Sequence, residues 1–120
     1  MTMGRLYVLC NNKLDPIYAA VQGGHAIAQY LIDQQEDTDN HKIRKSKWSN
    51  DTVVYLSVDI DKWHEILSNT RDQECFFSSW HEPDYGGKLT SIALHAPGGS
   101  AVLKKLKKEK LLDAHSLFTR

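Results

Sequence analysis

The chain has few of the features that mark secreted, membrane or metal-binding proteins. Its two cysteines, Cys10 and Cys75, are too few for a disulfide framework in 120 residues, and we expect both to be reduced and buried in strands. No run of eighteen apolar residues is present, so no membrane span is expected. The N-terminus lacks the basic start and apolar stretch of a signal peptide, which predicts a cytoplasmic protein.

Motifs for bound nucleotides and metals are also missing. The sequence has no GxSxG, P-loop or Rossmann glycine pattern, so it gives no support for nucleotide-dependent chemistry. The six histidines are scattered without the close spacing that is typical of zinc ligands. We therefore expect a protein that works without a metal or a cofactor.

The charge is balanced overall but uneven along the chain. Fifteen Lys and Arg residues match fifteen Asp and Glu residues. An acidic segment at 36–39 precedes a basic segment at 42–47, and a second lysine-rich segment at 104–110 begins with Lys104 and Lys105. Such lysines can contact the phosphates of a nucleic acid, although most such runs are solvated surface. The charge therefore makes Lys104 and Lys105 candidates for substrate contact without identifying a nucleic-acid-binding protein.

Hydrophobic patterns predict a single α/β domain over residues 1–120. Short apolar runs rich in strand formers predict strands at 5–10, 52–58, 75–80 and 89–95. Helices are expected to begin after Asp15, after Asp59 or Asp61, and at Ser100, and to end near residues 35, 70 and 108. Residues 36–50 and 81–88 are expected to be loops. The order βαβαββα predicts a four-stranded mixed sheet with helices on both faces.

The first expected helix combines an apolar stripe with an unusual polar flank. The stripe, which is expected to face the core, consists of Ile17, Ala20, Val21, Gly24, Ile27 and Leu31. The flank follows spacings of four, three and four residues and consists of Tyr18, Gln22, His25 and Gln29. An exposed face ordinarily carries Lys and Glu, whereas this flank offers a phenol, two amides and an imidazole, which suit binding or proton transfer. A partly exposed flank with no chemical task is the alternative.

A second polar group follows the third expected strand. The loop 81–88 contains Glu82, Asp84 and Lys88. In open α/β sheets, binding sites gather at loops that leave the carboxyl ends of strands, so this loop is expected to form a second wall of a site beside the first helix. Asp84 follows Pro83 in a glycine-rich turn, so bracing of the turn backbone is an alternative role for its carboxylate.

Two segments resemble the signatures of one known family. Gln22-Gly-Gly-His25-Ala26, within the first expected helix, resembles the Gln-x-x-His-Ala segment of type 2 peptidyl-tRNA hydrolases. Glu82-Pro-Asp84, followed by Leu89-Thr90-Ser-Ile-Ala, resembles that family's aspartate loop and the threonine-containing strand after it. The opening strand and the βαβαββα order also match, so the resemblance covers nearly the whole chain.

The resemblance implies a hydrolase that cleaves the ester joining a peptide to the 3′ end of tRNA, with peptidyl-tRNA as its partner. By position, Asp84, Thr90 and His25 match family site residues. The family has a lysine early in the first helix where this chain has Tyr18, and Lys13 in the preceding loop matches an earlier family lysine.

In such a hydrolase, Asp84 would orient or deprotonate the attacking water. Helix N–H groups, with Lys13 or His25, would stabilise the oxyanion. The candidates for substrate binding are Gln22, Lys88, Lys104 and Lys105.

Two other functions stay open at this point. Tyr18 carries no charge at neutral pH and replaces an ammonium poorly, which favours a non-catalytic module that binds tRNA, a nucleotide or a protein on the same fold. The zero net charge favours a hydrolase of another ester or amide, because tRNA-binding proteins are usually more basic. The sequence also leaves open whether the chain forms a homodimer.

Overall fold

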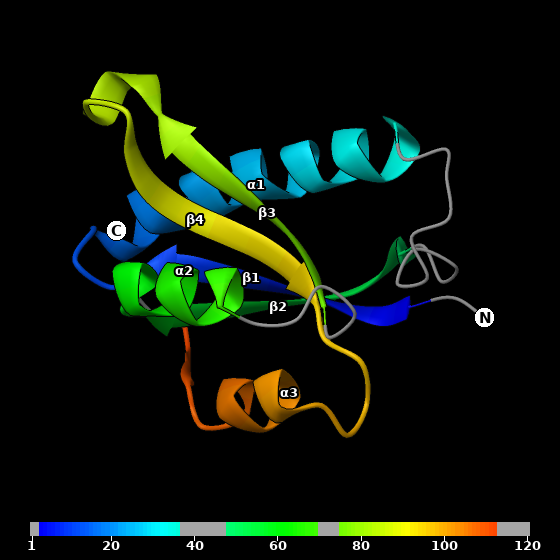
Figure 1. Ribbon diagram of the computed structural model, residues 1–120. Helices are drawn as coiled ribbons and strands as arrows, with labels where there is room; N and C mark the ends of the chain where they lie inside the picture. The colour runs from blue at the N-terminus through cyan, green and yellow to red at the C-terminus, as the bar shows by residue number, and fades with distance from the viewer. Residues whose placement is uncertain (1–2, 37–47, 70–74, 113–120) are drawn as a thin grey trace.

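A mixed five-stranded sheet with three helices forms the structure, which is a computed structural model describing residues 3–36, 48–69 and 75–112 (Figure 1). The strands are β1 (Met3–Asn11), β2 (Trp48–Val58), β3 (Phe76–Glu82), β4 (Lys88–His95) and β5 (Lys110–Leu111). The helices are α1 (Pro16–Glu36), α2 (Ile60–Ser68) and α3 (Ala101–Leu106), and a 3-10 turn, η2 (Pro83–Tyr85), connects β3 to β4.

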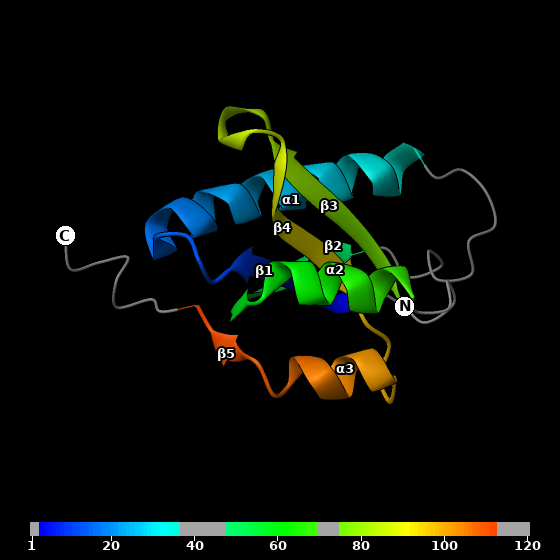
Figure 2. The same cartoon turned by 60° about the vertical axis from the view of Figure 1, so that its left-hand side comes forward.

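The strands lie in the order β3-β4-β1-β2-β5. β1 and β2 are parallel, and α1 lies in the connection between them, as a parallel pair requires. The remaining neighbours are antiparallel, with β3 and β4 joined as a hairpin. α1 covers one face of the sheet, and α2 and α3 lie on the other (Figures 1 and 2). The predicted α/β class and mixed sheet are confirmed.

The predicted number of strands and the predicted order are wrong, because β5 adds a fifth strand after α3. β5 has two residues and pairs with β2 at the edge of the sheet. Two residues show no alternation of apolar and polar side chains, so no sequence pattern could indicate this strand. The predicted loops are also too long: residues 48–50 begin β2, and His81 and Glu82 extend β3. The rest of the first loop, residues 37–47, lies outside the described residues.

The predicted core stripe of α1 is right only in part, because Ala20 and Ile27 pack against the core whereas other members are exposed. Val21 is 56% exposed and Leu31 is 37% exposed. The buried residues of α1 that pack toward the sheet include Ala19, Gln22, Gly23, Ala26 and Tyr30. The helix is therefore turned so that part of the polar flank, and not the whole apolar stripe, faces the strands.

Close approach of α1 to the sheet explains this orientation. A Cβ atom placed on Gly23 would lie 2.8 Å from Tyr55 Cε2 and 2.9 Å from Val8 Cγ1, so any larger residue would force one of these side chains to shift. Small residues on this face bring the helix backbone near the strands, and dispersion contacts improve as the gap closes. The larger side chains of the predicted stripe would hold the helix further away.

The ends of two helices agree with the sequence pattern. Asp15 Oδ2 accepts a hydrogen bond from the Ile17 N–H at 3.1 Å at the start of α1. Asp59 Oδ1 accepts one from the Lys62 N–H at 3.3 Å, so Asp59 is the N-cap of α2 and Asp61 lies in its first turn. Each carboxylate satisfies a backbone donor that the first helical turn leaves without a partner.

Both cysteines are buried, and neither forms a disulfide among the described residues. Cys10 lies in β1 as predicted, whereas Cys75 lies directly before β3. Burial raises the pKa of the Cys10 thiol to about 12, so it stays protonated. Among the described helices, none has the length together with the apolar character that crossing a membrane requires.

Candidate functional site

The polar flank of α1 lies against the β3–β4 hairpin, and Gln22 is one of the residues that join them. The Gln22 side chain is 3% exposed. Thr90 Oγ1, in β4, donates a hydrogen bond to Gln22 Oε1 at 3.1 Å, and Ser91 Oγ donates one to the Gln22 backbone oxygen at 2.7 Å. Buried polar groups are tolerated when they are paired in this way, so these bonds fix the helix against the hairpin.

His25 lies one turn further along the flank and stacks on Trp80 of β3. The two ring centroids are 4.8 Å apart, and the ring planes are inclined by 14°. His25 remains exposed on its other side. The indole therefore holds the imidazole in one orientation while leaving it accessible to a ligand.

Glu82 stands at the end of β3 and organises the turn that follows. It is 7% exposed, and its carboxylate accepts hydrogen bonds from Trp80 Nε1 and from the Asp84 N–H, each at 3.1 Å. The Asp84 N–H hydrogen bond, followed by those from Trp80 and Gln22 and the nearby charge of His25, lowers the pKa of Glu82, against an opposing effect of desolvation. Glu82 is therefore held as a carboxylate.

Asp84 lies in η2, where the chain turns back toward β4. Gly86 and Gly87 follow with φ of 66° and 71°, a conformation that side chains other than glycine rarely adopt. Bracing of this turn was the alternative role for the Asp84 carboxylate. Glu82 has this role instead, because its side chain accepts a hydrogen bond from the Asp84 N–H. Within the described part of the chain, the exposed Asp84 carboxylate accepts no hydrogen bond, so it is available to a ligand.

Tyr18 and Tyr85 form the outer edge of the same region. Their rings meet edge to face with centroids 6.5 Å apart, and both residues are 37% exposed. Lys88 Nζ lies 5.3 Å from the centroid of the Tyr85 ring, within range of a cation–π interaction. Desolvation, and after it the charges of Glu82 and Asp84, raises the pKa of Tyr18, so its phenol keeps its proton and acts as a neutral donor.

The structure gathers most of the predicted site residues in one region and leaves some outside it. The residues connected through the α1–hairpin contact are Tyr18, Gln22, His25, Asp84, Lys88 and Thr90. Lys13 lies in the turn before α1, and no hydrogen bond or ring contact among the described residues joins its side chain to them. Lys104 and Lys105 belong to α3, on the opposite face of the sheet (Figure 1).

Gln29, the last member of the predicted flank, belongs to a different network. Its Nε2 donates to Asp33 Oδ1 at 2.9 Å, and Asp33 Oδ2 accepts a hydrogen bond from Ser78 Oγ at 2.6 Å. These bonds attach the later part of α1 to β3. Gln29 therefore has a structural partner of its own.

Three site residues were not predicted as such, namely Trp80, Glu82 and Tyr85. The sequence pattern predicts a second wall that contains Glu82 but gives this residue no role. Alternation along β3 puts Glu82 on the same side as Trp80, two residues earlier. This spacing would have predicted the hydrogen bond between Trp80 and Glu82 only if the sequence had also shown that β3 extends to Glu82. The described residues contain no group of three or more His, Cys, Asp and Glu side chains placed to hold a metal ion.

Comparison with known proteins adds no family assignment. No protein-family model matches the chain, and no curated protein sequence matches it significantly.

Proposed function

We propose that the chain is a hydrolase that cleaves the ester joining a peptide to the 3′ end of tRNA. The observation that carries this proposal is the 3.1 Å hydrogen bond from Thr90 Oγ1 to Gln22 Oε1. It joins the two segments that resemble the signatures of type 2 peptidyl-tRNA hydrolases, which supports one site shared by the helix flank and the aspartate turn. Such convergence supports catalysis because an ester must meet the base and the oxyanion donors at once.

Asp84 is the general base in this proposal. Its exposed carboxylate accepts a proton from water as the water oxygen bonds to the ester carbonyl carbon. The tetrahedral intermediate then breaks its bond to the 3′ oxygen of tRNA, and that oxygen takes the proton from Asp84. The hydrogen bond from the Asp84 N–H to Glu82 fixes the backbone that carries the base.

His25 and Tyr18 supply hydrogen-bond donors to the oxygen on which negative charge develops. The stack on Trp80 orients the His25 ring, and the raised pKa of Tyr18 keeps its phenolic proton in place. A phenol is a weaker oxyanion donor than an ammonium, so we expect a slower enzyme than one with a lysine at this position. Thr90 is fully buried and acts as a positioning residue through Gln22.

A non-catalytic module that binds the single-stranded end of an RNA is the second candidate. The exposed pair of Tyr18 and Tyr85, with Lys88 beside it, favours this function. Bases of single-stranded RNA stack on aromatic side chains, and a nearby lysine contacts the phosphate. The two candidates share a ligand and differ only in turnover.

The decisive experiment measures peptide release from a peptidyl-tRNA by the wild-type chain and by Asp84→Asn. We expect release by the wild type, and a loss of about 10²–10⁴-fold in kcat on substitution, because that is the usual contribution of a general base. Asp61→Asn is the matched control, since it makes the same chemical change in an exposed first-turn residue of α2 on the other face of the sheet.

Three outcomes separate the candidates. Loss of release in Asp84→Asn but not in Asp61→Asn supports the hydrolase. Release that is unaffected by Asp84→Asn removes Asp84 from the mechanism. A wild-type chain that binds peptidyl-tRNA saturably without releasing peptide favours the binding module.

A further inference from the structure

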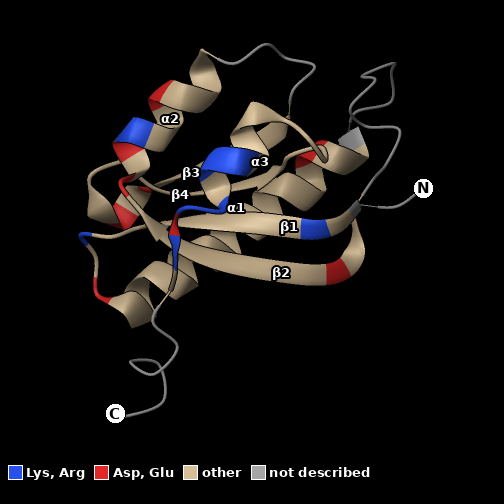
Figure 3. Cartoon of the chain, turned by 90° about the horizontal axis from the view of Figure 1, so that it is seen from below, with Lys and Arg blue, Asp and Glu red and all other residues tan. Residues whose placement is uncertain are grey.

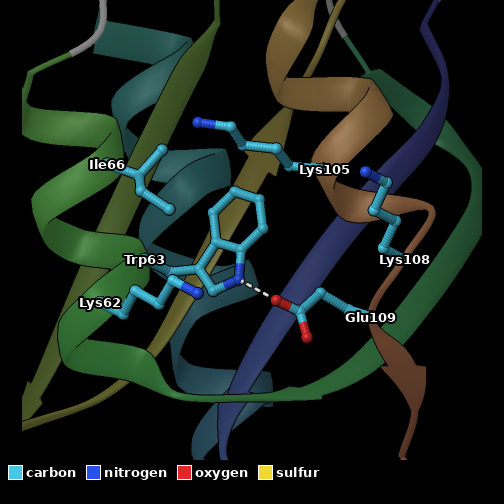
Figure 4. A pocket seen from close by; sticks show the side chains of 6 residues that line it. All are labelled: Lys62, Trp63, Ile66, Lys105, Lys108 and Glu109. Carbon is cyan, nitrogen blue, oxygen red and sulfur yellow. Dashed lines mark hydrogen bonds between the residues drawn. The ribbon is translucent and has the colours of Figure 1, made fainter.

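A hollow of about 330 Å³ lies between α2 and α3, on the face of the sheet opposite α1. Its lining comprises Lys62, Trp63, Ile66, Lys105, Lys108 and Glu109 (Figure 4). Pockets that hold small molecules begin at about 300 Å³, so the hollow has room for a small ligand. None of its lining residues belongs to the proposed hydrolase site.

The lining carries an unbalanced positive charge. Three lysines face a single glutamate. That glutamate already has a partner, since Trp63 Nε1 donates a hydrogen bond to Glu109 Oε2 at 2.6 Å. Among the described residues, none of the three ammonium groups is paired with a carboxylate. Like charges gathered around one hollow repel each other, and a bound anion would relieve that repulsion.

The three lysines come from two elements that the fold brings together. Lys62 lies in α2, and Lys105 and Lys108 lie in and after α3. Figure 3 shows that the charged residues of α3 are all basic, whereas α2 has both basic and acidic residues; those of α3 are Lys104 and Lys105. Because α2 and α3 are separated by the β3–β4 hairpin in the chain, this cluster exists only in the folded protein.

Apart from Glu109, the rest of the lining is apolar. Trp63 is 1% exposed, and Figure 4 shows its ring lying between Lys62 and Lys105 with Ile66 close by. Its hydrogen bond to Glu109 fixes the ring plane. A ligand that fits therefore has an anionic group for the lysines and a compact, less polar part for this wall.

We propose that this hollow, the α2–α3 site, binds the phosphate group of a phosphorylated molecule. The ammonium groups of Lys62, Lys105 and Lys108 contact the phosphate oxygens, as compact point charges suited to that ligand. The sugar or ring attached to the phosphate rests against Ile66, above the buried ring of Trp63. The phosphate belongs either to a free mononucleotide or to the backbone of an RNA, and the experiment distinguishes the two.

The test titrates adenosine 5′-monophosphate into the full chain and follows the Trp63 Nε1–H resonance by NMR, with calorimetry for affinity. We expect this resonance to shift and the Kd to lie below about 1 mM. The variant pair Lys105→Gln with Lys108→Gln should weaken binding by at least about tenfold. The control pair Lys104→Gln with Lys110→Gln removes the same charge from residues outside the lining and should change Kd less than about twofold.

Competition between the mononucleotide and a short single-stranded RNA identifies the source of the phosphate. Displacement of the mononucleotide by RNA, in a manner that depends on Lys105 and Lys108, assigns the site to an RNA backbone. Retention of the mononucleotide against RNA assigns it to a free nucleotide. Two results overturn the proposal: no shift of the Trp63 resonance at millimolar ligand, or equal weakening by the two variant pairs. Neither result depends on peptide release, so the hydrolase is tested separately.

Discussion

Both faces of the sheet have an apolar core against their helices, and the face under α1 adds a close helix approach and buried polar pairs. Under α2 and α3, large apolar side chains such as Trp63 and Leu106 are almost fully buried. Under α1, small residues allow close approach, and buried polar groups such as Gln22 and Thr90 pair with each other. Apolar burial tolerates many exchanges of similar volume, whereas a paired polar contact requires particular atoms. The proposed catalytic groups lie on the face where geometry is set by particular atoms.

The largest expected difference concerns two tryptophans on opposite faces of the sheet, Trp63 and Trp80. Trp63→Ala should lower the free energy of unfolding by about 3–5 kcal/mol, because it removes a fully buried ring from the core. Trp80→Ala should cost clearly less, since Trp80 is only half-buried. Urea unfolding followed by circular dichroism measures both. Equal losses would show that the face under α1 has an apolar core of the same strength.

Two neighbouring glycines test how closely α1 approaches the sheet. Gly23→Ala should destabilise the protein by about 1–3 kcal/mol, because its Cβ would meet Tyr55 and Val8. Gly24→Ala, where a Cβ meets open space, should stabilise it by about 0.5–1 kcal/mol through helix propensity. Thermal unfolding of the two variants gives shifts of opposite sign if α1 sits as described. A stabilising Gly23→Ala would contradict the close approach.

The polar pairing can be tested at Thr90. Thr90→Val keeps the shape of the side chain and removes the donor to Gln22, leaving a buried amide oxygen unpaired at a cost of about 1–3 kcal/mol. Thr52→Val makes the same exchange at an exposed position in β2 and should change stability by less than about 0.5 kcal/mol. Chemical unfolding compares them. If both variants behave alike, the Gln22–Thr90 bond does not hold the helix.

The smallest expected effect is the pH dependence that Glu82 adds to this face. Its folded pKa is lowered from the usual 4.5, so the stability it contributes is present above that value and is lost as pH falls through the folded pKa. Glu82→Gln removes this contribution. The stability difference between the wild type and Glu82→Gln should therefore shrink as pH is lowered from 7 to below 4.5. A difference that grows on acidification would mean that the pKa is raised.

Several elements of the fold could be predicted because their signals are local. Asp15 and Asp59 cap helices through hydrogen bonds to residues two and three positions away. The apolar runs of β1 and β4 predict strands without information from distant residues. The resemblance to the hydrolase signatures also predicts that His25 and Asp84 belong to one site. β5 could not be predicted, since two residues carry no periodicity and its pairing with β2 is a contact distant in the chain.

The direction of α1 shows the limit of the sequence pattern. Its apolar residues have helical spacing and correctly predict a helix, but they do not decide which face is buried. That choice depends on the distance between the helix and β1, which the missing side chain of Gly23 permits to be short. The buried Gln22 is stable only because Thr90 and Ser91, nearly seventy positions later, supply donors.

The residue order alone therefore established the α/β class, the start of the main helices and the polar character of one helix flank, because each depends on neighbours in the chain. The fold established which residues of that flank are buried, the stack of His25 on Trp80 and the lysine-lined hollow between α2 and α3. These features join segments that are distant in the chain. Their geometry is set by packing and by the pairing of buried polar groups, and the local periodicity of the sequence predicts neither of these.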